Sequence, residues 1–103
     1  MAARLLALYK HPADKATFDA YYAATHIPLA KTLPGLRRYE VSVGPVSGPQ
    51  GASEYHLVAT LHFDSMDAIQ KTLGTAEGAA TAGDLANFAQ AGVDLLMFDD
   101  KVV

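Results

Sequence analysis

Alternating hydrophobic and polar positions along the chain predict four strands. Residues 4–10 form a short apolar run that ends at His11-Pro12, and residues 93–98 form another. Residues 36–44 and 54–64 alternate with a period of two, which is typical of strands with one face against a core. Residues 44–53, between these two strands, are rich in Gly and Pro and predict a mobile loop. On the strand 54–64, one face carries Tyr55, Leu57, Ala59, Leu61 and Phe63, and the other carries His56, Val58, Thr60 and His62.

Two helical regions separate the strands. Asp14 is placed to cap a first helix that runs to about Thr25 or His26. Pro28 has no N–H group and clashes with the carbonyl of Ala24, so we expect a kink or a restart there, followed by one more turn over residues 29–33. Ser65 is placed to cap a helix over residues 66–73, and a Gly- and Ala-rich helix follows from residue 75 to about residue 91.

The order of these elements predicts the fold class. It is β-α-β-β-α-β, the ferredoxin-like arrangement of an α+β protein, with a four-stranded antiparallel sheet and both helical regions on one face. The chain of 103 residues has the length of a single domain, and we expect one domain over residues 1–103.

The second face of this sheet is expected to be apolar as well. On the strand 54–64, Leu57, Ala59 and Leu61 lie on one face and Val58 and Thr60 on the other, and on the last strand Leu95 and Met97 lie opposite Leu96 and Phe98, so both faces carry apolar residues. An uncovered apolar face on a small domain usually marks a partner. The simplest partner is a second copy of the chain, so the pattern predicts a homodimer that packs sheet against sheet.

Composition narrows the range of partners and chemistry. The net charge is −3 without a block of like charges, so nucleic acid and anionic membranes are not expected as partners. The chain has no cysteine, which excludes disulfides and thiolate chemistry. We expect a cytoplasmic protein, because the apolar run at the N-terminus is too short for a signal peptide and no stretch is long enough to span a membrane.

One helical stripe carries the main candidate chemistry. At spacings of four, four and three residues, the stripe that must face the sheet consists of Phe18, Tyr22, His26 and Leu29. Histidine titrates near pH 6.5, which suits general acid–base catalysis, so His26 is a candidate catalytic residue with Tyr22, and Tyr21 is placed to bind a substrate oxygen. The alternative is a core histidine bonded to a backbone carbonyl, such as one that Pro28 leaves unpaired.

Other polar and aromatic side chains give weaker candidates. His56 and His62 are about 20 Å apart along an extended strand, so the two cannot bind one metal ion, and no metal site is predicted. Asp84 could cap part of the second helical region or orient a histidine, and capping is the expected role. The sequence carries no nucleotide-binding or serine-hydrolase motif, so no cofactor is expected. The residues that we consider for substrate binding are Tyr21, His11, His56, His62 and Phe88.

Several segments resemble the EthD family. These are Tyr-Lys-x-Pro from Tyr9, Phe-x-x-Tyr-Tyr-x-x-x-His-x-Pro-Leu from Phe18, Leu-Pro-Gly-Leu from Leu33, and the later segments "ATLHFDSMDAI" and "GDLANF". The resemblance covers nearly the whole chain. It implies the dimeric α+β barrel fold and a link to the degradation of ethyl tert-butyl ether.

The resemblance also implies a range of activities. Many relatives carry the label reductase, and other families with this fold are cofactor-free monooxygenases, isomerases and polyketide cyclases. A fold shared with these enzymes does not determine the reaction. We therefore expect a small-molecule enzyme, of oxidoreductase or cyclase and isomerase type, that acts on an apolar or aromatic substrate. The alternatives are an accessory protein that binds a ligand or a partner oxygenase without catalysis, and a structural dimer whose cleft is filled by Tyr21, Tyr22 and Phe88.

Overall fold

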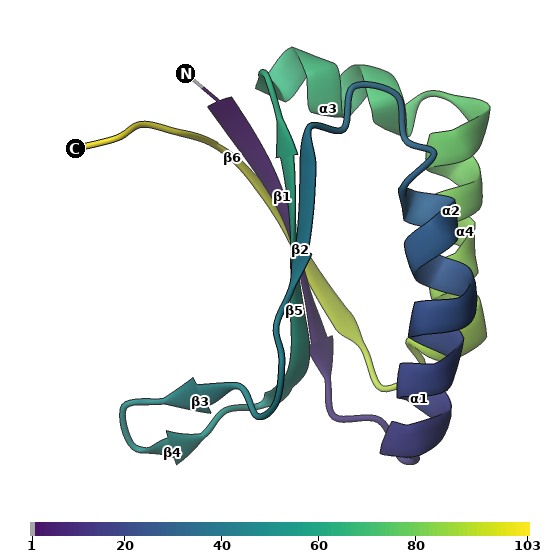
Figure 1. Ribbon diagram of the computed structural model, residues 1–103, viewed down its shortest axis with the longest axis vertical. Helices are drawn as coiled ribbons and strands as arrows, with labels where there is room; N and C mark the ends of the chain where they lie inside the picture. The colour runs from purple at the N-terminus through teal and green to yellow at the C-terminus, as the bar shows by residue number, and fades with distance from the viewer. Residues whose placement is uncertain (1) are drawn as a thin grey trace.

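The elements follow the predicted β-α-β-β-α-β order, with additional short pieces. A computed structural model describes residues 2–103, and Figure 1 shows the four long strands as one sheet with the helices on one side of it. The ferredoxin-like α+β fold is therefore confirmed. In chain order the elements are β1 (Ala2–Lys10), α1 (Lys15–Tyr21), a π-helical turn η1 (Tyr22–His26), α2 (Ile27–Ala30), β2 (Arg38–Val41), β3 (Ser47–Gly48), β4 (Gly51–Ala52), β5 (Tyr55–Phe63), α3 (Met66–Leu73), α4 (Ala76–Phe88) and β6 (Val93–Asp100).

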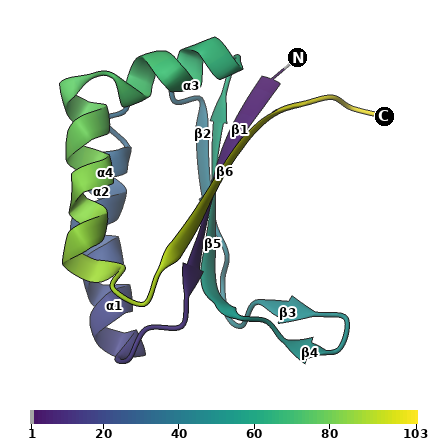
Figure 2. The same ribbon diagram turned by 180° about the vertical axis from the view of Figure 1, so that it is seen from behind.

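The sheet has the order β2-β5-β1-β6, and its neighbouring strands are antiparallel. The two central strands, β1 and β5, contribute alanine, leucine and aromatic side chains to the side that faces the helices. Figure 2 shows that α4 and the α1–α2 region run alongside one another over that side. The buried core between the sheet and the helices includes Tyr9, Phe18, Tyr22, Ala59, Leu61, Phe63, Ile69 and Phe88.

The predicted helix starts are confirmed by their caps. The carboxylate of Asp14 accepts a hydrogen bond from the Thr17 N–H at 3.0 Å, and the hydroxyl of Ser65 accepts one from the Ala68 N–H at 3.1 Å. Such caps satisfy N–H groups that have no partner inside the helix. Within residues 2–103, no helix is long and apolar enough to cross a membrane.

Residues 44–53, which were predicted to be a loop, contain secondary structure of their own. Two short antiparallel strands, β3 and β4, pair Ser47 with Ala52 and Gly48 with Gly51. Gly51 has a φ of 121°, a conformation that side-chain-bearing residues rarely adopt, and it allows the tight return of the chain. The resulting hairpin projects away from the sheet on the side opposite the helices (Figure 1).

The predicted face assignment is wrong at the start of β5. Tyr9 pairs with Leu57 and Lys10 pairs with Tyr55, so His56 is an extra residue in a β-bulge. The bulge shifts the alternation of side chains. Tyr55 donates its hydroxyl to Asp94 of β6, and the ring of His56 lies edge-on 5.1 Å from the ring of Phe18 on the helix side.

The face of the sheet away from the helices is apolar at its centre, as predicted. Cross-strand pairing places Leu6 between Thr60 and Leu96, and Leu8 beside Val58. We call these residues, with Phe98, the open face. Polar pairs lie around it: Arg4 binds Asp100 at 2.7 Å and His62 binds Glu40 at 2.7 Å. The hairpin and the C-terminal segment extend on this side of the sheet (Figure 1).

Candidate active site

A π-helical turn brings His26 to the sheet. The N–H of Ile27 donates to the carbonyl of Tyr22, five residues back, where a regular α-helix would bond four residues back. Pro28 follows in the first turn of α2 and has no N–H to donate. A new helical segment does begin beside it, at Ile27, but His26 and Ile27 keep helical backbone angles, so the chain passes through the π-helical turn without leaving the helix. The wider turn keeps side chains four residues apart on one face. As a result, the side chains that this region buries against the sheet are Phe18, Tyr22, His26 and Ala30.

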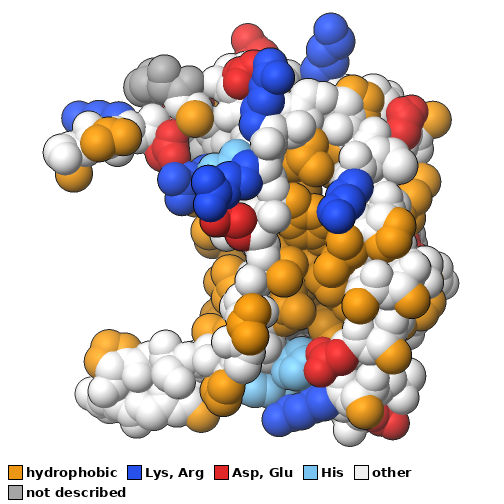
Figure 3. Space-filling model, in the orientation of Figure 1, with side chains coloured by type: hydrophobic (Ala, Val, Ile, Leu, Met, Phe, Trp, Pro, Cys, Tyr) orange, Lys and Arg blue, Asp and Glu red, His pale blue; other side chains and the backbone are white. Residues whose placement is uncertain are grey.

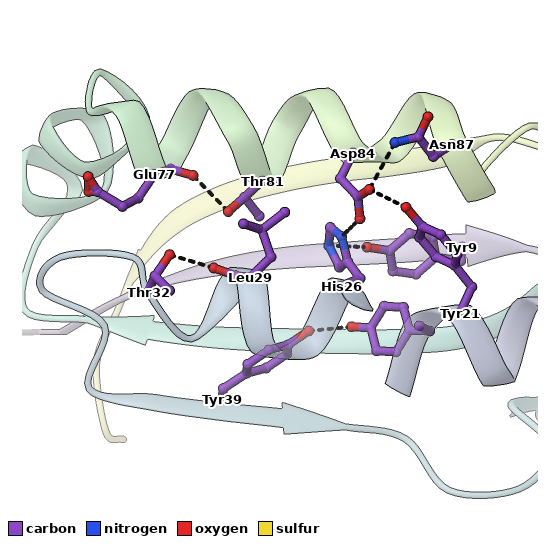
Figure 4. Close-up of polar contacts among 11 residues, drawn as sticks. Tyr9, Tyr21, His26, Leu29, Thr32, Tyr39, Glu77, Thr81, Asp84 and Asn87 are labelled. Atoms are coloured by element: carbon purple, nitrogen blue, oxygen red, sulfur yellow. Dashed lines mark hydrogen bonds and ion pairs between the residues drawn. The ribbon is translucent and has the colours of Figure 1, made fainter. Parts of the chain in front are cut away.

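His26 is paired with a buried carboxylate from the other helical region. Its Nδ1 atom lies 2.8 Å from Oδ2 of Asp84, which is on α4, and the two side chains are only 5% and 7% exposed. The second oxygen of Asp84 accepts hydrogen bonds from the hydroxyl of Tyr21 at 2.5 Å and the side-chain amide of Asn87 at 3.0 Å. Figure 4 shows the three donors converging on this one carboxylate.

The hydrogen bonds keep Asp84 ionised. Burial acts to raise the pKa of Asp84, but the hydrogen bonds from Tyr21, Asn87 and His26 outweigh it, and the pKa lies below its ordinary value. An ionised carboxylate can only accept hydrogen bonds, so it assigns a proton to Nδ1 of His26. In the neutral imidazole, Nε2 then carries the free lone pair.

One phenol, that of Tyr9, lies near the free nitrogen of His26, and the ring of Tyr22, which bonds a third phenol, packs 5.4 Å from the His26 ring. The hydroxyl of Tyr9 lies 3.5 Å from Nε2, and the hydroxyls of Tyr22 and Tyr39 are 2.5 Å apart. Burial raises the pKa of all three tyrosines. They are therefore neutral hydrogen-bond donors at physiological pH. Tyr39 belongs to the edge strand β2 and approaches this cluster from the sheet (Figure 4).

These polar groups border an apolar cavity of about 70 Å³ between the sheet and the helices. Figure 3 shows hydrophobic side chains gathered between the two layers when the molecule is viewed from the β2 side. Among residues 2–103, no Lys, Arg, Asp or Glu lines the cavity. Its lining consists of Leu5, Ala7, Tyr9, Tyr22, His26, Ala30, Leu33, Tyr39, Ala59, Leu61, Leu73, Gly78, Thr81, Ala82, Leu85 and Leu95.

Comparison with known proteins identifies the family of the chain. The model of the EthD domain matches residues 10–92. The chain belongs to the EthD family. A relative from Rhodococcus erythropolis, described as an uncharacterized 11.0 kDa protein in the thcB-thcC intergenic region, is 35% identical over 97% of this chain and 96% of its own length.

Solved structures agree with the EthD assignment. An ethyl tert-butyl ether d (EthD) family protein from Bacillus halodurans C-125 has a TM-score of 0.90 and 35% identity, over 98% of this chain and all of that one. A dimeric ferredoxin-like protein of unknown function from Thermobifida fusca has a TM-score of 0.69 and 18% identity, over 95% of this chain and 90% of that one. SnoaB, a cofactor-independent oxygenase from Streptomyces nogalater, has a TM-score of 0.63 and 16% identity, over 99% and 94%. The last two likenesses concern the fold alone.

The structure of this EthD-family chain brings two of the residues that the sequence predicts into the cavity, His26 and Tyr22. Tyr21 and Phe88 lie behind it: Tyr21 binds Asp84, and the ring of Phe88 packs 4.7 Å from the ring of His26. His11 and His56 line a separate open groove, with a ring separation of 6.1 Å. His62 binds Glu40 on the other side of the sheet.

Metal binding was not predicted for these histidines. In the part of the chain that the structure describes, no group of three or more His, Asp or Glu side chains is close enough to hold a metal ion. His11 lies 2.9 Å from the carbonyl oxygen of Ser53, and His56 lies 2.8 Å from a carboxylate oxygen of Asp19.

Two members of the site, Tyr9 and Tyr39, were not among the predicted site residues, and Asp84 was predicted chiefly as a helix cap. Asp84 does not cap a helix; it lies inside α4 and binds His26, the less favoured of the two expectations. The alternation of residues 36–44 placed Tyr39 on the same strand face as Val41, which could have directed attention to it. No backbone carbonyl engages His26 in the described contacts, so the partner differs from the one expected for a purely structural core histidine.

Proposed function

We propose that this EthD-family protein is an enzyme that moves a proton on an uncharged, largely apolar small molecule, with His26 as general base and acid. The observation that carries the proposal is the buried Asp84–His26 pair, which directs Nε2 toward an apolar cavity. A histidine held by a carboxylate through Nδ1 is oriented for proton transfer at Nε2.

The reaction follows from the groups at the cavity wall. Nε2 of His26 takes a proton from an O–H, whose electron pair stays on the oxygen, or from a C–H beside a carbonyl. In the second case the C–H electron pair forms the C=C bond of an enolate, and the π pair of the carbonyl moves to the substrate oxygen. The negative charge of Asp84 stabilises the imidazolium that forms. The Tyr9 hydroxyl donates a hydrogen bond to the developing oxyanion. The imidazolium then returns the proton to another atom, which completes an isomerisation or a ring closure.

Cofactor-free oxygen chemistry could begin with the same step, because removal of a proton gives an electron-rich anion that can react with dioxygen. The cofactor-independent oxygenase SnoaB shares the fold, which supports this version by analogy only. The name of the family refers to ethyl tert-butyl ether, so branched ethers and alcohols belong among the molecules tested as ligands.

We infer that the working unit is a homodimer. The open face presents Leu6, Leu8, Leu96 and Phe98 at its centre, and Leu96 is 52% exposed in a single chain. An apolar centre with a polar rim is the usual anatomy of an interface. The dimeric ferredoxin-like protein from Thermobifida fusca supports the same assembly.

The proton transfer can be tested without knowledge of the natural substrate. Small methyl ketones are incubated with the protein in D₂O, and exchange of the hydrogens beside the carbonyl is followed by NMR. We expect His26→Ala to slow the protein-dependent exchange by about 10²–10⁴-fold. The matched control is His56→Ala, because His56 also lies 2.8 Å from a carboxylate but does not line the cavity.

Two results would overturn the catalytic proposal. One is equal exchange in His26→Ala and the unaltered protein. The other is ligand binding, detected as a rise in the melting temperature, without any exchange in the unaltered protein. The second result would favour the non-catalytic alternative, a ligand-binding or accessory protein.

A further inference from the structure

We infer that the substrate has a small, uncharged oxygen-bearing head and a longer apolar body, and that the body lies outside the cavity along the β6 edge of the molecule. The inference rests on the proposed function, because it takes the same cavity as the place where the head reacts. It adds the way in, the size limit and the charge of the ligand.

The exposed lining residues show where the cavity opens. Of the sixteen residues that line the cavity, only three are exposed: Leu73 at the end of α3, Ala82 on α4 and Leu95 on β6. The other lining residues are buried or half-buried. The cavity therefore opens between α4 and β6, the edge that faces the viewer in Figure 2.

The opening is lined by exposed apolar side chains. Leu95 is 52% exposed and Leu73 is 38% exposed, although both side chains are large and apolar. Met97 follows Leu95 on the same face of β6 and is 44% exposed. We call Leu73, Leu95 and Met97 the apolar rim. Exposed apolar side chains that continue from a cavity lining indicate a surface on which an apolar ligand can lie.

The size of the cavity limits how much of a ligand can enter it. A cavity of about 150 Å³ lined by apolar side chains holds a benzene molecule. At about 70 Å³, this cavity holds roughly half as much. It therefore accepts a head of a few heavy atoms, such as an acetyl or hydroxymethyl group, while the rest of the molecule stays on the rim.

The residues that line the cavity favour an uncharged ligand head. Within the described chain, the cavity has no cationic lining residue that could pair with a carboxylate or phosphate. The polar side chains that line it are His26, three neutral tyrosines and Thr81, whose hydroxyl donates to the carbonyl of Glu77. An anionic head would lose its hydration without a compensating charge. A ketone can accept a hydrogen bond from Tyr9, and an alcohol can donate one to Nε2.

A homologous series of ligands tests this geometry. Binding of 2-alkanones, from 2-butanone to 2-nonanone, is measured by NMR titration, with straight-chain alkanoates of equal length as the anionic controls. We expect affinity to rise about three- to fourfold for each methylene that reaches the rim. Alkanoates of the same length should bind at least tenfold more weakly.

Two neighbouring leucines provide a matched pair of variants. Leu95 and Leu96 are both 52% exposed, but they lie on opposite faces of β6. Leu95→Asn should weaken binding of 2-nonanone at least fivefold and leave 2-butanone almost unchanged. Leu96→Asn, measured at a protein concentration at which sedimentation shows it to be a dimer, should leave both affinities unchanged, because its side chain lies on the open face and not at the cavity.

Three results would overturn the inference: affinity that does not depend on chain length, alkanoates that bind as well as ketones, or equal losses in the two leucine variants. A dimer weakened by Leu95→Asn with unchanged ketone affinity would also overturn it, because the rim would then belong to a second copy. Measuring the series and the exchange together in the unaltered protein separates the two proposals. There, a dependence on chain length without exchange contradicts only the proposed chemistry, and exchange without that dependence contradicts only the binding geometry.

Discussion

At the scale of single residues, the site is organised around one carboxylate. Asp84 receives hydrogen bonds from side chains of α1, η1 and its own helix, so a single buried charge fixes the orientation of His26 and the position of Tyr21. Such a charge is favourable only while all its partners remain in place, because an unpaired buried carboxylate costs several kcal/mol. The geometry of Nε2 therefore depends on a residue that does not touch the cavity.

The pH dependence of stability tests this role of Asp84. Its pKa in the folded protein is lower than the ordinary value of 3.8, so the ionised carboxylate stabilises the fold above about pH 4 and this contribution is lost as the pH falls through the folded-state pKa. Asp84→Asn should lower the free energy of unfolding at pH 7 by about 1.5–3 kcal/mol. Its stability should also fall less steeply between pH 5 and pH 3, as measured by urea unfolding.

Asp19→Asn is the control for this measurement. Asp19 also binds a histidine, but its side chain is 59% exposed. The change should alter stability by no more than about 0.5 kcal/mol. A loss of the same size in both variants would contradict the special role of the buried pair.

Among single residues, local sequence patterns placed His26 and Tyr22 at the cavity but not the contact between His26 and Asp84. The spacing of Phe18, Tyr22 and His26 was enough to place two side chains at the cavity, because helical periodicity is a local property. Asp84 is 58 residues from His26 in the chain, and their contact depends on how α4 packs against α2 and η1. Local patterns carry no information on such a pair.

At the scale of elements, α3 and α4 meet in a very close contact. A Cβ atom at Gly78 would lie 2.2 Å from the carbonyl oxygen of Thr72 and 2.7 Å from the Cα of Leu73. Gly78 is in the first turn of α4, where its N–H donates to the hydroxyl of the cap residue Thr75. The absence of a side chain therefore determines how α4 starts and, with it, the wall of the cavity.

Two glycines of the same helix provide a test. Gly78→Ala should destabilise the protein by about 1–3 kcal/mol, because backbone atoms rather than a flexible side chain must move. Gly83→Ala has no atom within 4 Å of the new methyl group and should stabilise α4 by about 0.5–1 kcal/mol. The measurement is urea unfolding of both variants, and a stabilising Gly78→Ala would show that the junction can widen freely.

Elements were predicted well where one local signal dominates. Asp14 and Ser65 indicated the helix starts, and Pro28 indicated an irregularity in the first helical region. Pro28 only removes a donor, so the sequence does not show that the irregularity is an i→i−5 turn within a continuous helix. The bulge at His56 was missed for a similar reason: it depends on how β1 and β5 align across the sheet.

At the scale of the whole molecule, the two faces of β6 have different expected roles. Leu96 and Phe98 point to the open face, whereas Leu95 and Met97 lie toward the cavity opening. The order of elements and the apolar second face followed from the sequence pattern. The exposure of Leu95 and Met97 did not, because it arises from the incomplete coverage of the edge strand by the helices.

Association of two copies can be tested on this strand. Phe98→Asp should place a charge in the centre of the proposed interface and convert a dimer into a monomer in sedimentation velocity at micromolar concentration. Met97→Asp is the matched control, because the two side chains are 40% and 44% exposed on opposite faces. A dimer that survives Phe98→Asp, or a single-chain species in the unaltered protein, would contradict the proposed assembly.

The alternation along β6 has a consequence for how sequences of this kind can diverge. One residue inserted or deleted between Phe88 and Val93 would turn each side chain of the strand to the opposite face. The ligand-facing leucine would then lie between subunits, and the subunit-facing leucine would lie beside the ligand. Gly92, with a φ of 116°, and the hydrogen bond from the Lys10 N–H to its carbonyl fix the length of this connection. We therefore expect homologues to vary freely in the length of the hairpin over residues 44–53, and to keep the number of residues between α4 and β6 constant.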